Sequence, residues 1–266
     1  MRRKSDTGDG SRCHVKICGL SRPEDVAYVN EARRTLGGPD FAGFIVNVPG
    51  SRRSITEERL RQLTALLDPE ITAVGVFVDE EPGVIARLLA EGVIGACQLH
   101  GSEDAEYIRA LRERIGQPAG PGDSPMIIKA FRPADGSSNR SSNGRSSGLS
   151  EASAEEIAHC PADLVLLDSG AGSGQTFDWS TLRDADGAGR IGRDFLLAGG
   201  LTPENIPEAG AAVRPWGIDL SSGVETDGVK DRGKILAAVR AAMGGSLHPA
   251  GRYGPEQSGI DRETHK

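Results

Sequence analysis

The sequence has few aromatic residues and no long apolar run. Phe, Trp and Tyr make up only 4% of its 266 residues, so we expect a core built from aliphatic side chains. No run of apolar residues is long enough to span a bilayer, which argues against a membrane protein. Residues 1–12 are polar and lack the apolar segment of a signal peptide. We therefore expect a cytoplasmic protein that does not bind membranes.

Metal ligands and basic patches are also scarce. The four cysteines form no C-x-x-C motif and no clustered ligand set, so we expect free thiols and no bound metal. The net charge is −7, and no stripe of Lys and Arg is interleaved with aromatic residues. A nucleic-acid partner is therefore not expected. An acidic protein can still bind an anionic ligand through backbone amides and helix N-termini.

Short apolar runs alternate with helical patterns along the chain. Strands are predicted at residues 13–18, 41–46, 72–78, 95–99, 126–131, 163–168, 194–198 and 216–220. Helices are predicted between them, the first with Ser21 as its N-cap and the second capped by Thr56. Near-continuous apolar strands are typical of a parallel sheet covered on both faces. Eight such alternations predict the α/β class and a single-domain (β/α)8 TIM barrel, with an open doubly wound sheet as the alternative.

Three segments fall outside this pattern. The barrel is expected to occupy residues 13–245, with disordered tails at 1–12 and 246–266. Residues 133–150 are rich in Ser, Gly and Asn and show no apolar periodicity. We interpret them as a disordered insertion in the barrel.

In a TIM barrel the active site lies at the C-terminal ends of the strands. Cys18 ends the first predicted strand, two residues after Lys16. Most free cysteines are buried apolar residues. A thiol at this position could act as a base or nucleophile if its pKa fell below the usual ~8.5. Both interpretations remain open from the residue alone.

Asp168 follows four aliphatic residues, in the stretch LVLLD. A carboxylate there could cap the following loop by accepting backbone N–H groups. Partial burial could instead raise its pKa, so that it holds a proton near neutral pH and acts as an acid. The two roles require opposite shifts of the pKa.

Further polar residues lie at other predicted strand ends. Lys16, Gln98 and Asp219 are expected to contact a substrate, whereas His100 is either a satisfied polar residue or a ligand contact. Arg52 and Arg53 could clamp a carboxylate with their guanidinium groups. Glycine-rich loops follow the last three strands and favour a phosphate site. Its expected residues are Gly172, Ser173, Gly174, Gly199, Gly200, Ser222 and Gly223.

Seven blocks of the sequence together resemble the phosphoribosylanthranilate isomerase family of tryptophan biosynthesis. They are VKICGLSRPEDV, GSRRSI, VGVFVDE, CQLHGSE, LLDSGAGSGQTFDW, LAGGLTPENI and DLSSGVE, and the resemblance as a whole covers roughly residues 13–243. The resemblance implies an Amadori rearrangement of N-(5-phosphoribosyl)anthranilate without metal or cofactor. It implies that Cys18 is the general base and Asp168 the general acid. It also implies that Arg53 meets the anthranilate carboxylate and that the glycine loops hold the phosphate.

The sequence departs from the family pattern at a few positions. Gln175 stands where the family often has Lys, which removes one cation from the expected phosphate loop. Another phosphosugar-binding TIM-barrel enzyme, or a ligand-binding relative without catalysis, therefore remains an alternative. A monomer or a homodimer is compatible with the sequence.

Overall fold

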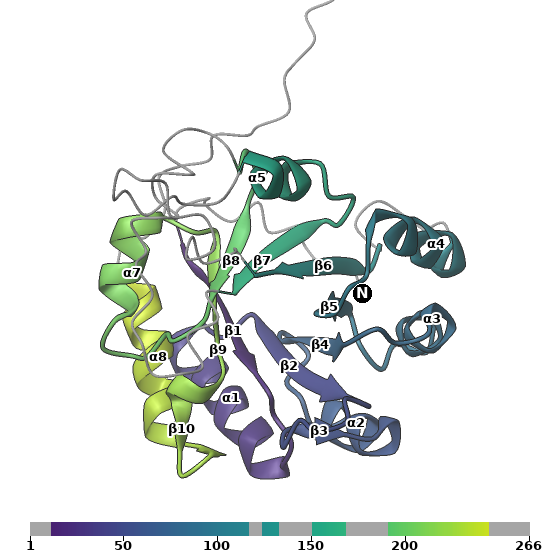
Figure 1. The fold of residues 1–266 in the computed structure, drawn as a ribbon. Helices are drawn as coiled ribbons and strands as arrows, with labels where there is room; N and C mark the ends of the chain where they lie inside the picture. The colour runs from purple at the N-terminus through teal and green to yellow at the C-terminus, as the bar shows by residue number, and fades with distance from the viewer. Residues whose placement is uncertain (1–11, 117–123, 133–150, 169–190, 245–266) are drawn as a thin grey trace, which may run out of the picture.

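The computed structural model describes residues 12–116, 124–132, 151–168 and 191–244. Its central feature is a nine-stranded sheet that closes on itself, because β1 pairs with both β2 and β9. The short β3 (Ser54–Ile55) lies beside β2 at the end of the strand order, which leaves eight strands in the ring (Figure 1). The ring strands are β1 (His14–Cys18), β2 (Phe41–Val46), β4 (Thr72–Phe77), β5 (Ala96–Leu99), β6 (Met126–Phe131), β7 (Leu164–Asp168), β8 (Phe195–Ala198) and β9 (Gly217–Leu220).

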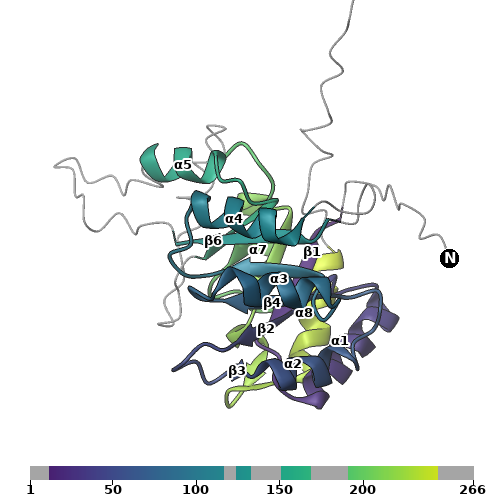
Figure 2. The same ribbon diagram turned by 90° about the vertical axis from the view of Figure 1, so that its right-hand side faces the viewer.

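All pairings within the ring are parallel, and helices cover its outside (Figures 1 and 2). The described helices are α1 (Pro23–Leu36), α2 (Glu57–Thr64), α3 (Pro82–Ala90), α4 (Ala105–Ile115), α5 (Glu151–Ala158), α7 (Ile206–Val213) and α8 (Arg232–Gly244). After β9 the chain forms the 3-10 turn η2 (Ser222–Val224) and a small hairpin of β10 (Glu225–Thr226) and β11 (Val229–Lys230). The predicted TIM barrel is confirmed, and each of the eight predicted strands lies within one residue of an observed one.

Some predictions fall on residues that the structure does not describe. They are the predicted tails, apart from Arg12, the insertion at 133–150, and residues 178–184, where a helix is expected between the strands predicted at 163–168 and 194–198. The three short strands β3, β10 and β11 were not predicted, because two-residue strands carry no periodicity.

The two predicted N-caps have different outcomes. Thr56 caps α2 as expected, and its side chain accepts the backbone N–H of Arg59 at 3.2 Å. The prediction for Ser21 was wrong, because Arg22 is the N-cap of α1. The Asp25 carboxylate accepts the backbone N–H groups of both Ser21 and Arg22 at 3.0 Å. That carboxylate therefore pairs with backbone N–H groups at the start of α1, and the Ser21 hydroxyl is not needed as a cap.

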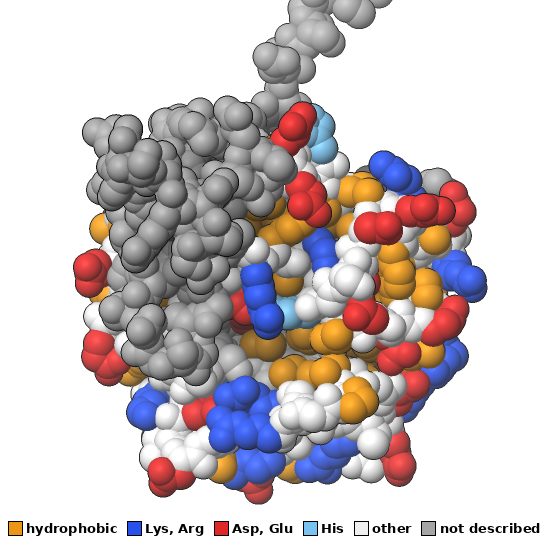
Figure 3. All heavy atoms as spheres, viewed as in Figure 1, with side chains coloured by type: hydrophobic (Ala, Val, Ile, Leu, Met, Phe, Trp, Pro, Cys, Tyr) orange, Lys and Arg blue, Asp and Glu red, His pale blue; other side chains and the backbone are white. Residues whose placement is uncertain are grey.

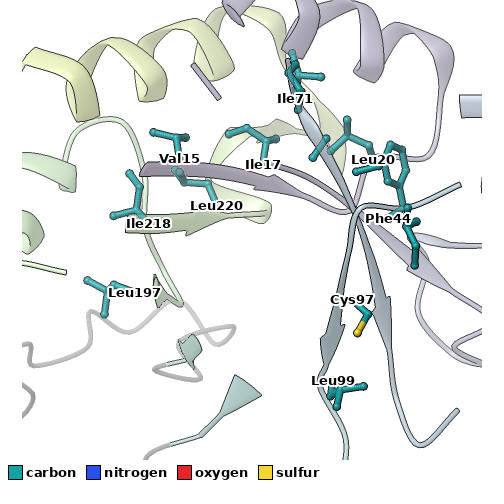
Figure 4. Packing of buried hydrophobic residues seen from close by; sticks show 14 of the residues in the cluster. Val15, Ile17, Leu20, Phe44, Ile71, Cys97, Leu99, Leu197, Ile218 and Leu220 are labelled. Carbon is teal, nitrogen blue, oxygen red and sulfur yellow. The ribbon is translucent and has the colours of Figure 1, made fainter. Parts of the chain in front are cut away.

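Alternate residues of each ring strand face opposite sides of the sheet. Val15 and Ile17 point from β1 toward the helices, where they belong to the larger apolar cluster (Figure 4). A second cluster fills the inside of the ring, with members on six of the strands: Phe41, Val74, Ala96, Ile128, Ala130, Leu164, Leu166, Leu196 and Ala198. Lys16 and Cys18 alternate with Val15 and Ile17, so their side chains face the interior of the ring.

Candidate active site

The C-terminal ends of the ring strands lie at the same mouth, because the strands are parallel. Cys18 is the last residue of β1 and Asp168 the last residue of β7. Asp168 alternates with Leu166, which faces the ring interior, so both side chains point inward. β8 and β9 separate the two strands, which is roughly 14 Å along the wall at ~4.8 Å per strand spacing. The acid and base candidates therefore share one opening.

A buried ion pair lies directly below the thiol. Lys16 is fully buried, and its Nζ lies 3.0 Å from Oδ1 of Asp219, its register partner on β9. Burial alone would lower the pKa of Lys16, but the nearby Asp219 and Cys18 outweigh it and raise that pKa. Lys16 is therefore a buried cation at neutral pH. Direct contact of this pair with substrate stays a prediction.

The Cys18 side chain sits over Gly43, its register partner on β2. A Cβ atom added at Gly43 would lie 2.9 Å from Cys18 Sγ and 3.1 Å from Lys16 Nζ. The missing side chain at Gly43 thus makes room for both groups. Burial raises the pKa of the Cys18 thiol, Lys16 lowers it, Asp219 raises it, and the net direction is upward. The sulfur is therefore a thiol at rest, and the lowered pKa that the sequence analysis set as the condition for a base or nucleophile is not found in this state.

Asp168 is connected to two of the predicted substrate-binding residues. His100 Nε2 lies 3.5 Å from Asp168 Oδ2, and His100 Nδ1 lies 2.8 Å from the Nε2 atom of Gln98. When the Gln98 amide donates to Nδ1, neutral His100 carries its proton on Nε2, facing Asp168. The guanidinium of Arg132 is also close, with its Nε atom 4.0 Å from Oδ2. The polar residues at the ends of β5 and β7 therefore form one network.

A second charged cluster lies beside Cys18 and centres on Glu225. Its buried carboxylate accepts hydrogen bonds from Arg53 Nε at 2.6 Å, Arg52 at 2.9 Å and Lys230 at 2.8 Å. Arg53 lies against the residue after Cys18, since a Cβ atom at Gly19 would be 2.6 Å from Arg53 Cδ. Figure 3 shows Lys and Arg side chains gathered on this face, between the places of β10 and β3 in Figure 1. The cluster thus provides a positive field near the thiol.

The loops after β8 and β9 meet at the same mouth. Gly199 and Gly200 both have positive φ, of 92° and 64°. A Cβ atom at Gly223 would lie 1.8 Å from the carbonyl oxygen of Leu201, so the two loops touch and only glycine fits there. Among the described residues, none accepts the backbone N–H of Gly200, Ser222 or Gly223. With respect to the part of the chain that the structure describes, these amides can donate to an anion.

Other predicted features have these outcomes. Gly172, Ser173 and Gly174 lie outside the described residues. Within the described residues, no group of three or more His, Cys, Asp or Glu is placed to hold a metal ion, and no helix is long and apolar enough to cross a membrane. All four cysteines are free, and three of them, Cys13, Cys18 and Cys97, are buried.

Sequence reasoning assigned no role to Gly43, Glu225 or Lys230. Glu225 closes the DLSSGVE block, and its place in that block was the only signal of a role. Its partner Arg53 is 172 residues away in the chain. No sequence pattern indicated a role for Gly43, because the need for a glycine at this position in the strand depends on the side chains of the neighbouring strand.

Comparison with known proteins gives one consistent result. The family model for N-(5′-phosphoribosyl)anthranilate (PRA) isomerase matches residues 15–241. The N-(5′-phosphoribosyl)anthranilate isomerase of Acetivibrio thermocellus is 40% identical over 242 residues, which cover 88% of this chain and 98% of that protein. The corresponding enzyme of Endomicrobium trichonymphae is 38% identical and covers 85% of this chain and 96% of its own length.

Solved structures agree with this result. The crystal structure of phosphoribosyl anthranilate isomerase from Thermotoga maritima has a TM-score of 0.66 and 35% identity, over 87% of this chain and 99% of that one. A phosphoribosyl anthranilate isomerase solved with reduced 1-(o-carboxyphenylamino)-1-deoxyribulose 5-phosphate has a TM-score of 0.65 and 33% identity, with the same coverage. The chain therefore belongs to the N-(5′-phosphoribosyl)anthranilate isomerase family.

Proposed function

We propose that this chain catalyses the Amadori rearrangement of N-(5-phosphoribosyl)anthranilate with Cys18 as general base and Asp168 as general acid. The product is 1-(2-carboxyphenylamino)-1-deoxyribulose 5-phosphate, in tryptophan biosynthesis. The isomerase activity follows from family membership. The roles of the residues rest on one observation, which is that the thiol and the carboxyl face the same mouth from β1 and β7.

The first step needs an acid. Opening the furanose breaks the bond between C1 and the ring oxygen, and that oxygen must take up a proton. The nitrogen lone pair forms the C=N bond of an iminium ion as the ring opens. Asp168 is placed to deliver the proton, and the neighbouring His100 can donate a hydrogen bond to the carboxylate that remains.

The second step needs a base. The C2 proton of the iminium ion must be removed, which gives an enolamine. The enolamine becomes the ketone when C1 takes up a proton and the C2 hydroxyl loses one. No net proton is gained or lost. Burial keeps Cys18 protonated at rest, but the positive iminium ion beside the sulfur favours the thiolate, as Lys16 does. The thiol must lose its own proton to solvent before it can take the C2 proton, and the fraction of Cys18 present as thiolate is therefore greatest while the positive intermediate is bound.

Two anionic groups of the substrate need partners. We assign the anthranilate carboxylate to Arg53, whose side chain lies against Gly19 next to the thiol. We assign the phosphate to the backbone amides of Gly200, Ser222 and Gly223, for which no described residue is an acceptor, on the loops that commonly hold phosphate in this fold. No cofactor is required, because each step is a proton transfer or a bond cleavage that the two side chains assist.

We place the reaction in the cytoplasm, in a monomer or a homodimer that acts on a free phosphosugar. Four free thiols suit a reducing compartment. One solved relative is described as mutually generated monomers of the dimeric isomerase from Thermotoga maritima, at 34% identity. Both states are therefore reasonable for this chain.

Two variants test the proposed roles. Cys18→Ala and Asp168→Asn should each lower kcat/KM for N-(5-phosphoribosyl)anthranilate by about 10²- to 10⁴-fold, measured by the loss of substrate fluorescence. The matched controls are Cys160→Ala, a half-buried thiol after α5, and Asp163→Asn, a carboxyl at the opposite end of β7. Both controls should keep the wild-type rate.

Three results would count against the proposal. Near wild-type turnover in a folded Cys18→Ala or Asp168→Asn protein would refute the residue roles. A wild-type chain that binds the product analogue without turnover would instead support the ligand-binding alternative. A chain that neither binds nor turns over this substrate would point to another phosphosugar enzyme.

A further inference from the structure

Arg53 is already held by a carboxylate before any substrate arrives. Its Nε donates to Glu225 Oε1 at 2.6 Å, and its Nη2 donates to Glu225 Oε2 at 2.8 Å. These two bonds use the side edge of the guanidinium plane in a two-point fork. The arrangement raises the question of how Arg53 could also bind a substrate carboxylate.

The guanidinium has a second edge at which a substrate carboxylate can bind. It carries five N–H groups, and Glu225 takes only two of them. Among the described residues, none accepts a hydrogen bond from Nη1 of Arg53, which together with the second proton of Nη2 forms the end of the group. A second carboxylate can therefore bind at this end while Glu225 keeps the side edge.

The charged groups around Glu225 leave a net positive charge that favours binding of a second anion. Arg52 and Lys230 also bond to Glu225, so three cations surround one carboxylate. Burial raises the pKa of Glu225, but hydrogen bonds from Arg53 and Lys230 outweigh it, and the net pKa is lowered. The carboxylate is thus charged at neutral pH, and the cluster still carries excess positive charge that attracts an incoming anion.

Glu225 also fixes where Arg53 can reach. Its side chain is 5% exposed, and Lys230, which holds it, is buried as well. On the other side, the Arg53 stem lies against Gly19, whose φ is +79°. A flexible arginine is therefore fixed at both ends of its side chain, beside the catalytic thiol.

We propose that Glu225 is a positioning residue for specificity, which holds Arg53 by its side edge so that the end of the guanidinium binds the anthranilate carboxylate. The inference rests on the proposed function. Glu225 does not touch the reacting atoms, so its loss should weaken binding of the carboxylated ring more than it slows the chemical step. A purely structural role would not distinguish substrates that carry this carboxylate from those that lack it.

The test compares two inhibitors in the full chain. One is reduced 1-(o-carboxyphenylamino)-1-deoxyribulose 5-phosphate, and the other is the same compound without the carboxylate. Wild type should bind the first more tightly. Glu225→Gln should reduce this preference by about 10- to 100-fold, which is the range expected for lost hydrogen bonds to charged groups. For the substrate, KM should rise by a similar factor while kcat changes less than about threefold.

The control is an identical fork elsewhere on the barrel. Arg232 donates through Nε and Nη2 to the two oxygens of Glu31, between α8 and α1. Glu31→Gln removes this fork and should leave the preference between the inhibitors and KM unchanged. Glu225→Asp, which keeps the charge on a shorter side chain, should give a preference between those of wild type and Glu225→Gln.

The outcomes separate this inference from the proposed function. If Glu225→Gln weakens both inhibitors equally, or lowers kcat without raising KM, Glu225 does not position the carboxylate clamp. If Glu225→Gln does not fold, Glu225→Asp decides by the same comparison, and an unchanged preference overturns the inference. If wild type fails to prefer the carboxylated inhibitor and does not turn over the substrate, the proposed function fails instead.

Discussion

Replacing Gly43 by Ala should damage catalysis more than folding if Cys18 is the base that we propose, because the new methyl group would take space that the Cys18 thiol occupies. The added Cβ would lie 2.9 Å from Cys18 Sγ, and ordinary contact begins at 3.4 Å. The sulfur must therefore move by about 0.5 Å, the difference between these two distances. The Cys18 Cα atom, at 3.1 Å, limits how far rotation of the side chain can help.

The size of the effect follows from two known sensitivities. A misplacement of 1 Å can cost about 10²-fold in rate, so a shift of half that size should lower kcat by about 10-fold, and more if Lys16 Nζ is also displaced. Overpacking of this kind typically costs about 1–3 kcal/mol. For a domain of this size that lowers Tm by roughly 2–12 °C.

The assay is steady-state kinetics with fluorescence detection, alongside thermal unfolding. Gly244→Ala is the control, because the Cβ position at this last residue of α8 has nothing within 4 Å. It should keep full activity. A Gly43→Ala protein that folds and retains wild-type kcat would show that the position of the Cys18 sulfur does not limit the reaction, and would refute the reasoning.

Three further predictions concern pH, stability and reactivity. Burial raises the pKa of Cys18 against the lowering effect of Lys16, and Asp219, Arg53 and Lys230 are the other charged groups that interact with the thiol. Because the proposed base must be deprotonated, kcat/KM should still rise with pH above 8. A plateau of kcat/KM below pH 7 would contradict this. Burial raises the pKa of Asp40, but the neighbouring His14, whose Nδ1 lies 3.5 Å from Oδ2, and the hydrogen bond from the Val15 N–H outweigh it, and the pKa is lowered. The stabilisation from Asp40 is therefore present above the unfolded pKa of ~3.9 and lost as pH falls further. Asp40→Asn should lower Tm at pH 7 but much less at pH 3, and equal losses at both pH values would be inconsistent with this. Burial raises the pKa of Cys13 and of Cys97 to about 12, so a thiol reagent should react first with the half-buried Cys160; rapid labelling that persists in Cys160→Ser would argue against this.

Much of the barrel could be predicted because each strand is recognisable from its own short stretch of sequence. Runs such as LVLLD and MIIKAF are short, aliphatic and bounded by turn residues, which is typical of strands buried on both faces. The α1 N-cap was missed for an equally local reason. The Asp25 side chain accepts the backbone N–H groups of Ser21 and Arg22, and the sequence analysis considered only Ser21.

The candidate site could be located but not understood from the sequence. Strand ends identify Cys18 and Asp168, because parallel strands bring them to one mouth. The direction of the Cys18 pKa could not be predicted, since it depends on burial and on Asp219, which joins the site from β9. The partner of Arg53 depends in the same way on a contact between residues 172 positions apart.

Ring closure has a consequence for when activity can appear. The Lys16–Asp219 pair joins the first and last ring strands across 203 residues of chain. Contacts of such long range form late, after the entropy of closing the intervening loop has been overcome. A growing chain on the ribosome, or one cut before β9, lacks the anion that balances Lys16 and the loop amides beyond it. Enzyme turnover is thus a direct readout of complete barrel assembly, and partly folded forms of this chain should be inert.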